Sequence, residues 1–331
     1  MVDEKLLLPI RLTPPTPRGS GEGCPDRTSP ALFVSSRSGF ADEEACRQYL
    51  AASRWPDGFR CPRCEGMAAQ QLPGRLLWRC RGCGRDTSVT AGTVLHRTRT
   101  PLTHWFWAAY LVTTHKPGLS ALQLQGQLGI GRYETAWVML HKLRQAMVRP
   151  GREPLHEKVE VDEVYIGGPE VGLRGGRQLD EKALVVAAVE VRGRASGRVR
   201  LRVVADASAE SLCGFVRATV EPGAIVLTGG WQGYAPLKAM GYRHKPRTQG
   251  SPVRAAKLLP RVHRAFGNLQ TWLRGTHHGV SRKHLQAYLD EFAFRFNRRH
   301  TPMAAFQALL GLGSVHGPTT YNQLYAVEST G

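Results

Sequence analysis

Four cysteines stand in two closely spaced pairs, Cys61 with Cys64 and Cys80 with Cys83. Each C-x-x-C turn presents two thiolates, and the segment between the pairs is long enough to fold as a hairpin that brings them together. Four thiolates with no open position are typical of structural, tetrahedral zinc. Two disulfides are the alternative, but nothing in the sequence indicates export, and cytosolic thiols stay reduced. The spacing therefore predicts a zinc ribbon that needs its Zn²⁺ to fold.

Arginines crowd the two cysteine pairs: Arg60, Arg63, Arg79, Arg81 and Arg85. Clustered positive charge attracts the phosphates of nucleic acid, so contact with DNA is one interpretation of this flank. A surface that docks another protein is the other interpretation. DNA is favoured because the whole chain is basic, with a formal net charge of +19 and a pI near 10.2.

Two carboxylates, Glu160 and Asp162, alternate with valines in the stretch VEVDEV. A period of two predicts a β-strand that points both acids to the same face of a sheet. Carboxylates among valines are costly unless something compensates their charge, as a divalent metal ion does.

The segments after this strand predict how the acids are positioned. Two further strand patterns follow, then a helix from about Ser208 and a strand at 224–228. Three antiparallel strands, a crossover helix and a parallel strand are the order of an RNase H-like α/β core. In that fold a first acid lies mid-strand, a second just after the fourth strand and a third on a later helix. Such acids hold the two metal ions of phosphoryl transfer.

Between the cysteines and the acidic strand, residues 101–149 follow a helical pattern. Ser120 is a typical N-cap, a short helix runs to Leu128, glycines fill a turn at 129–131, and a second helix begins at about Tyr133. This layout predicts a helix-turn-helix whose second helix enters a DNA groove. An ordinary packed pair of helices is the alternative. Three basic residues of the segment are predicted to reach phosphates or bases: Arg132, Lys142 and Arg144.

The predicted fold class is multidomain α+β. The N-terminal segment is rich in Pro, Gly, Ser and Arg and is predicted to be disordered. No apolar run approaches the roughly 20 residues that cross a bilayer, and the start of the chain lacks the features of a signal peptide. We therefore expect a cytoplasmic protein with no membrane partner. The predicted domains are the disordered segment (1–38), the zinc ribbon (39–95), the helix-turn-helix-like domain (96–152), the RNase H-like domain (153–312) and a C-terminal tail (313–331).

Several separate stretches resemble bacterial insertion-sequence transposases of the DDE class that carry an N-terminal zinc ribbon. They run from about Phe40 to Arg299 and read WPDGFRCPRC, SVTAGTVLHRTRTPL, VEVDEVYIGG, GGWQGY and VHRAFGNLQTWLRGTHHGVSRKHLQAYLDEFAFRFNRR. The resemblance implies binding of terminal inverted repeats and target DNA, and cleavage and transfer of DNA strands with Mg²⁺ as cofactor. It also implies a homo-oligomer that holds two element ends together, located in the cytoplasm at the bacterial nucleoid.

The resemblance assigns roles to individual residues. Asp162 takes the place of the first catalytic aspartate and magnesium ligand, and His263 takes the third catalytic position. A neutral imidazole is a weak magnesium ligand, so His263 is expected to position a phosphate or relay a proton. The usual second aspartate falls at Gly229, and the usual lysine after the third position falls at Gln270. Three residues on one face of a later helix are predicted either to form exposed salt bridges or to contact DNA: Glu291, Arg295 and Arg298.

Glycine at position 229 removes a carboxylate that would hold metal. Loss of one ligand from a two-metal site removes several kcal/mol of transition-state stabilisation, roughly a thousand-fold or more in rate. Asp206 and Glu163 are the nearest acids in sequence, but the predicted fold does not place either as a substitute. The leading hypothesis is therefore a DNA transposase impaired in this copy. The alternatives are a catalytically inactive, transposase-derived DNA-binding protein or repressor, and an RNase H-like nuclease.

Overall fold

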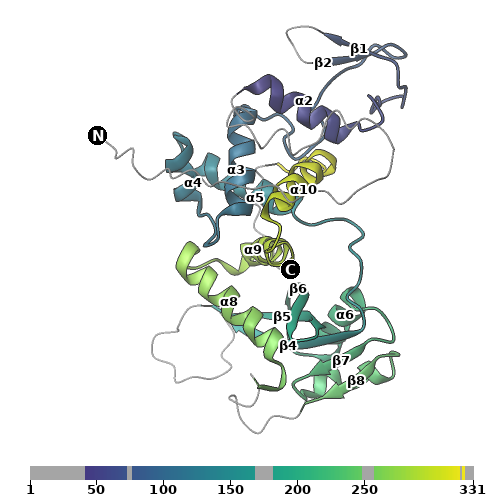
Figure 1. Cartoon of the computed structure of the whole chain (residues 1–331), viewed down its shortest axis with the longest axis vertical. Coiled ribbons are helices and arrows are strands. Elements are labelled where there is room, and N and C mark those ends of the chain that lie inside the picture. Colours follow the sequence, from purple (N-terminus) through teal and green to yellow (C-terminus); the bar gives the residue numbers. More distant parts are fainter. Residues whose placement is uncertain (1–41, 73–76, 168–181, 248–256, 321–322, 325–331) are drawn as a thin grey trace, which may run out of the picture.

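The computed structural model describes residues 42–72, 77–167, 182–247, 257–320 and 323–324. Along the long axis of the molecule, a small sheet lies at one end, a group of helices in the middle and a larger sheet at the other end (Figure 1). The segment 1–38, which is predicted to be disordered, lies outside the described residues. Within those residues, no helix combines the length and the apolarity needed to cross a membrane.

The small sheet is antiparallel and carries the second cysteine pair. Its strands are β1 (Ala69–Leu72), β2 (Leu77–Cys80) and β3 (Asp86–Ser88), with β2 in the centre. The ring of Trp55 lies 5.0 Å from the rings of Phe59 and Trp78, edge-on to both. This aromatic cluster is small, and a core of this size rarely stabilises a fold without a metal or a disulfide.

The helices in the middle share one hydrophobic core. They are α2 (Glu43–Arg54), α3 (Leu102–Thr114), α4 (Ala121–Leu128), α5 (Tyr133–Ala146) and α10 (Pro302–Val315). Phe106, Leu140 and Phe306 are fully buried in this core. We call these five helices the helical body. The predicted bounds place α2 with the ribbon and α10 with the RNase H-like core, whereas both helices pack in the helical body. The body is therefore assembled from segments far apart in the sequence.

The predicted helix, glycine turn and second helix are α4, Gly129 and α5. The hydroxyl of Ser120 accepts from the N–H of Gln123, and the Gln123 side chain accepts from the N–H of Ser120. Gly129 ends α4 in the left-handed conformation, with φ 63°. Most of α5 faces the core, so its N-terminal end, with Arg132 and Tyr133, is its accessible part. The two helices are confirmed, and DNA contact by them stays a prediction.

The larger sheet has five strands in the order β6-β5-β4-β7-β8. The strands are β4 (Lys158–Ile166), β5 (Ala183–Arg192), β6 (Ala195–Val204), β7 (Ile225–Thr228) and β8 (Arg243–Pro246). β4, β5 and β6 are antiparallel, and β7 pairs parallel with both β4 and β8. The helix α6 (Ala209–Thr219) leads from β6 to β7. This is the predicted RNase H-like order, which the structure confirms.

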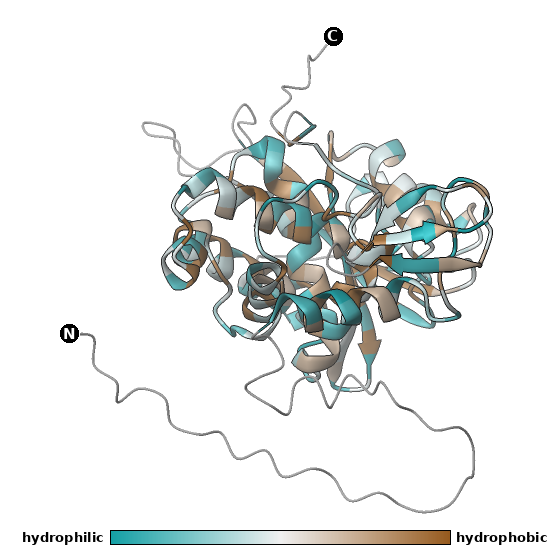
Figure 2. Ribbon diagram, turned by 90° about the horizontal axis from the view of Figure 1, so that it is seen from above, coloured by the Kyte–Doolittle hydropathy of each residue, from teal (hydrophilic) through white to brown (hydrophobic). Residues whose placement is uncertain are grey.

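Helices cover both faces of this sheet. α6 and the 3₁₀-helix η2 (Gln232–Lys238) pack on one face, and α8 (Pro260–His277) and α9 (Arg282–Asn297) pack on the other. Hydrophilic and hydrophobic residues alternate along most helices in Figure 2, as they do in helices that bury one side. α9 contacts both β6 and α5, so it joins the sheet to the helical body.

Candidate functional site

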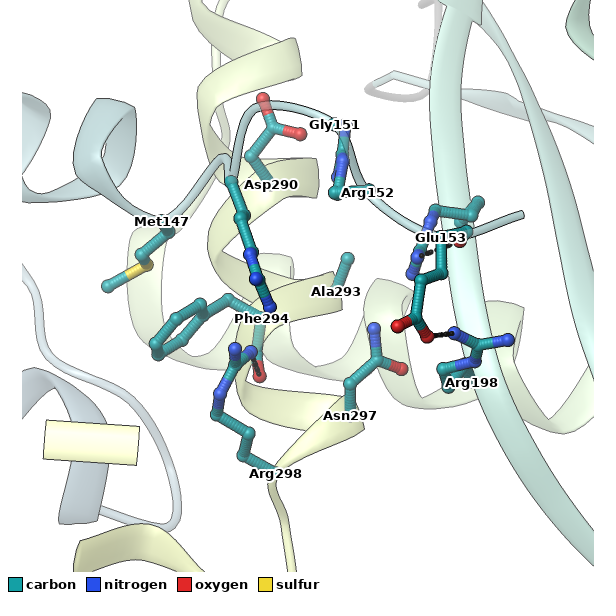
Figure 3. A pocket seen from close by; sticks show the side chains of 12 residues that line it. Met147, Gly151, Arg152, Glu153, Arg198, Asp290, Ala293, Phe294, Asn297 and Arg298 are labelled. Atoms are coloured by element: carbon teal, nitrogen blue, oxygen red, sulfur yellow. Dashed lines mark hydrogen bonds and ion pairs between the residues drawn. The ribbon is translucent and has the colours of Figure 1, made fainter. Parts of the chain in front are cut away.

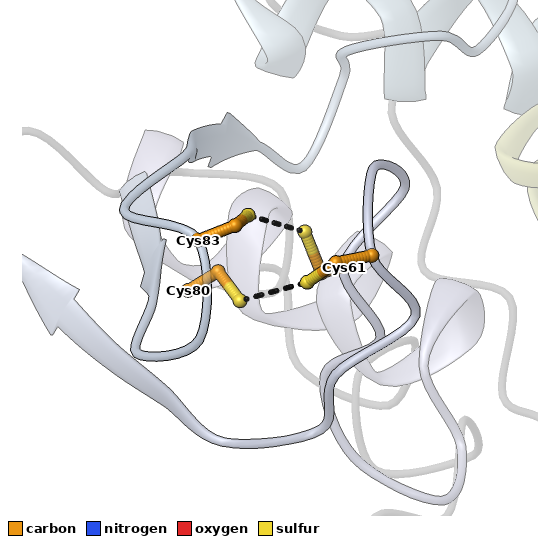
Figure 4. A group of neighbouring side chains, drawn as sticks. Cys61, Cys80 and Cys83 are labelled. Atoms are coloured by element: carbon orange, nitrogen blue, oxygen red, sulfur yellow. Dashed lines mark hydrogen bonds between the residues drawn. The ribbon is translucent and has the colours of Figure 1, made fainter.

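The four cysteines predicted to hold zinc converge in the ribbon. The Sγ atoms of Cys61 and Cys83 lie 3.6 Å apart, those of Cys64 and Cys80 lie 3.5 Å apart, and all four lie within 4.8 Å of one another (Figure 4). Zn–S bonds of about 2.3 Å in a tetrahedron separate sulfurs by roughly 3.8 Å, so the thiolates fit a zinc ion. The four-cysteine ribbon is confirmed. Among the described side chains, no other group of three or more Cys, His, Asp or Glu is gathered this tightly.

Backbone hydrogen bonds shape both cysteine turns in the same way. The N–H of Glu65 donates to the carbonyl of Cys61, and the N–H of Gly84 donates to the carbonyl of Cys80, each at 2.9 Å. Glu65 and Gly84 both have left-handed backbones, with φ of 59° and 69°. The ligand geometry is therefore set locally, within each turn.

The arginines around the ribbon fall into two groups. Arg79 donates to both carboxylate oxygens of Asp86, at 2.7 and 2.8 Å, and Arg60 lies 3.6 Å from Glu65. The others are exposed and form no ion pair within the described part of the chain: Arg63, Arg81 and Arg85. These three remain available for an anionic partner.

Glu160 is compensated by the protein and not by a metal. Its side chain is 1 % exposed, and one oxygen lies 2.8 Å from Nη1 of Arg261. The other oxygen accepts from the N–H groups of Arg261 (2.7 Å) and Val262 (3.1 Å) at the start of α8. A helix N-terminus and a guanidinium both favour a carboxylate. The expectation that a metal compensates this acid is therefore wrong for Glu160. The sequence signal that was missed is Pro260 followed by Arg261, because proline favours the first turn of a helix.

Asp162 lies on the same face of β4 and has a different neighbour. Its Oδ2 lies 3.3 Å from Nε2 of His263 on α8, and the side chain is 14 % exposed. Burial raises the pKa of Asp162 to about 6, against a smaller lowering by the N–H of Glu163. Burial also lowers the pKa of His263. Both shifts favour the uncharged forms of the two side chains.

The contact between Asp162 and His263 leaves one polar atom unsatisfied. Nε2 of His263 is buried and has no hydrogen-bond partner of acceptable geometry in the described structure. Nε2 of His263 shares this state with four other buried side-chain atoms of the described residues. The structure thus brings together two of the predicted site residues.

Gly229, the position that the resemblance assigns to the second acid, directly follows β7. β7 pairs with β4 in parallel register, with Val161 opposite Thr228. β7 ends at Thr228, and the same register continued by one residue would set position 229 beside Asp162, with both side chains on one face. Gly230, and not Gly229, has a positive φ, 85°. Position 229 therefore does not require glycine for its backbone conformation.

The two acids considered as substitutes for a residue at 229 have other partners. Glu163 points to the opposite face of β4 from Asp162 and accepts from the hydroxyl of Tyr234 at 2.7 Å. Asp206 accepts from the N–H of Ser208 and the hydroxyl of Ser211, at 3.0 and 2.8 Å, just before α6. A two-ion magnesium site needs bridging carboxylates. Among the described residues, Asp162 and His263 form no group of three or more potential ligands with another Cys, His, Asp or Glu, so they do not fit such a site.

The remaining predicted site residues lie on α8 and α9. Gln270 is half-buried, two turns along α8 from His263. Glu291 is fully buried and accepts from Nε of Arg144 at 2.7 Å, and Arg144 is 1 % exposed. The predicted exposed salt bridge is therefore a buried one, and Arg144 does not reach DNA as predicted. Arg295 lies 3.5 Å from Glu291 and donates to carbonyls of the turn between α3 and α4.

Two family models match segments of this chain, one in the larger sheet domain and one in the ribbon. Residues 154–297 match the family model described as ISXO2-like transposase domain, and residues 41–86 match the transposase zinc-ribbon domain. The matched segments contain the four cysteines, Asp162, position 229 and His263.

Known proteins similar to the chain include a curated relative and a solved structure. "Uncharacterized protein in transposable element ISH50" of Halobacterium salinarum is 26% identical over 278 residues, which cover 77% of this chain and 91% of the relative. The crystal structure of the Mos1 strand transfer complex is 12% identical, with a TM-score of 0.26, and the match covers 63% of this chain and 78% of that chain.

Proposed function

Because the chain belongs to the ISXO2-like transposase family and carries a transposase zinc ribbon, we propose that it is a DNA transposase of an insertion sequence. In this proposal it binds the terminal inverted repeats of its element, and its ancestral reaction is metal-dependent cleavage and transfer of DNA strands. Two element ends must be held together for that reaction, so the working form is a homo-oligomer on DNA.

DNA as the partner is supported by charge and exposure. The chain carries a formal net charge of +19. Arg63, Arg81 and Arg85 are exposed beside the ribbon, and Arg132 is exposed at the start of α5. Positive charge of this kind binds phosphates and makes the affinity depend on salt. The ribbon then contributes to DNA contact, and its zinc is structural because four thiolates leave no open position.

This copy is proposed to cleave DNA poorly or not at all. The observation that supports this proposal is the parallel register of β4 and β7, with Val161 opposite Thr228, which continued by one residue brings Gly229 beside Asp162. Asp162 keeps the first catalytic position. The unpartnered nitrogen of His263 is free to position a phosphate or relay a proton. With glycine at 229, the second carboxylate of the two-metal arrangement is missing.

A second candidate function is a catalytically inactive DNA-binding protein that occupies element ends as a repressor. It is favoured by the same glycine and because, among the residues that the structure describes, no further carboxylate is grouped with Asp162 and His263. Both candidates share the DNA partner and differ in cleavage.

The test is cleavage of a labelled duplex that carries the element's end, with Mg²⁺ or Mn²⁺ added. The native protein is compared with Gly229→Asp. Gly229→Asn is a control, since its side chain has the same size as that of Asp but no charge. Asp162→Asn/Gly229→Asp is a second control, since it restores one carboxylate and removes the other. We expect nicking by Gly229→Asp alone.

Each other outcome has a distinct meaning. Nicking by the native protein at a rate comparable to that of Gly229→Asp would show that another acid completes the site. Binding of the element's end without nicking by any variant would favour the repressor. Failure to bind the end at all would contradict both candidates.

A further inference from the structure

A cavity lies between the helical body and the larger sheet, away from Asp162 and from the ribbon. Its volume is ≈ 380 Å³, and it is walled by the connection from α5 to β4, by β6 and by α9 (Figure 3). Five of its lining residues are arginines: Arg149, Arg152, Arg198, Arg200 and Arg298. Only two lining residues are acidic, Glu153 and Asp290. The cavity is therefore strongly cationic.

Protein carboxylates neutralise only part of this charge. Arg198 lies 2.6 Å from Glu190 and 3.2 Å from Glu153, so it is paired. The other four arginines form no ion pair within the described part of the chain. Burial raises the pKa of Asp290 to about 6, against smaller lowerings by Arg152, Gln286 and Arg202, and its carboxylate accepts from the amide of Gln286 at 3.3 Å.

Two of the unpaired arginines are held in place by neutral groups. Arg200 is 9 % exposed and donates to the carbonyls of Val199 and Glu153, each at 3.1 Å. The guanidinium of Arg298 lies 4.0 Å over the ring of Phe294. Burial, followed by the neighbouring Arg152, Arg198 and Arg298, lowers the pKa of Arg200 to about 10. Like charges are thus fixed beside one another with too few anions, and a bound anion would relieve their repulsion.

We propose that this cavity binds a phosphate of the DNA backbone. Planar guanidinium groups bind phosphate oxygens in pairs, and Arg is the side chain best suited to that geometry. Arg149 and Arg152 are exposed at its rim, so a duplex lying along the surface reaches it. The inference rests on the proposed function, since the cavity would contact the same DNA at a site separate from Asp162 and from the ribbon. The site would anchor DNA where the helical body meets the larger sheet.

The test measures DNA affinity against salt concentration with the full chain. A fluorescein-labelled duplex of random sequence is titrated with the native protein and with Arg152→Gln/Arg298→Gln. The matched control is Arg217→Gln/Arg243→Gln, which removes the same charge from the helix α6 and the edge strand β8, neither of which lines the cavity. Each lost phosphate contact lowers the slope of log K against log salt by about 0.9. We expect the cavity pair to weaken binding by about tenfold and to lower the slope by about one, and the control pair to change affinity less than about twofold.

Two further variants keep the result interpretable. Arg152→Lys/Arg298→Lys retains the charge and is expected to restore the salt slope and part of the affinity. If the double glutamine variant does not fold, as judged by thermal melting and zinc content, Arg152→Gln is compared with Arg217→Gln, since both positions are exposed. Equal losses in the cavity and control variants would overturn the phosphate site alone. A native protein that binds no duplex would overturn the proposed function as well.

Discussion

The zinc ribbon and the acidic face of β4 both gather groups that repel one another when ionised, but they relieve the repulsion differently. In the ribbon, four thiolates face one another and fit a metal ion. On β4, the protein itself compensates Glu160 with Arg261 and the start of α8, and leaves Asp162 with His263. The ribbon should therefore depend on its ion for folding, whereas the RNase H-like core should not.

The largest expected effect is loss of the ribbon when a ligand is removed. Cys80→Ser leaves three thiolates around the zinc, and structural zinc contributes about 10–16 kcal/mol of binding free energy to folding in small zinc domains. Bound zinc, measured by elemental analysis, should fall from about one ion per chain to nearly none. Near-ultraviolet circular dichroism should show that Trp55 and Trp78 lose their fixed environment.

The control for the ribbon is a buried cysteine outside it. Cys213 lies on α6, where its Sγ donates to the carbonyl of Gly233 at 3.3 Å. Cys213→Ser should keep the full zinc content. A chelator that melted the larger sheet together with the ribbon would break the comparison, because it would make the core depend on metal as well.

A smaller but clear effect is expected from Glu160→Gln. Removing one partner of a buried ion pair costs about 3–5 kcal/mol, because the other charge is left uncompensated. Urea unfolding followed by far-ultraviolet circular dichroism measures the loss. Asp86→Asn is the matched control, since it breaks the exposed pair with Arg79 and should cost about 1 kcal/mol or less. Equal losses in the two variants would contradict the structural role of Glu160.

Asp162→Asn should raise the stability of the protein at neutral pH, whereas Glu160→Gln should lower it. The pKa of Asp162 is raised from 3.8 to about 6 by burial, so the folded protein holds this proton more tightly than the unfolded chain does. Between about pH 4 and pH 6, its contribution to stability falls as the pH rises, and above that range the ionised group costs about 2–3 kcal/mol.

The amide at position 162 removes this cost. Asp162→Asn should be more stable than the native protein at about pH 7.5, and the gain should vanish below about pH 4. The free energy of unfolding, measured in urea across this range, gives the difference. No gain at neutral pH would mean that a further group already compensates the carboxylate.

Several features could be predicted because their signals are local. The two C-x-x-C turns each set their own geometry, and Ser120 and Gly129 cap α4 through bonds that span a few residues. Alternation of Glu160 and Asp162 with valines predicted a strand with both acids on one face. In each case the residues that decide the structure are neighbours in the chain.

The partners of the charged residues were not predictable in this way. The sequence assigns Arg144 to DNA and Glu291 to an exposed salt bridge, whereas the two form one buried pair across α5 and α9. Arg261 lies about a hundred residues after the Glu160 that it compensates. The cationic cavity likewise draws its arginines from three separate segments.

The sequence by itself determined the ligands of the ribbon, the order of strands and helices, and the identity of residue 229 as glycine. Only the tertiary structure decided which acids are compensated, which arginines lack an ion-pair partner, and the parallel register of β7 with β4. The physical reason is that burial and charge compensation depend on which distant segments meet in space. Spacing along the chain carries information about turns and periods, but not about the dielectric surroundings of a side chain.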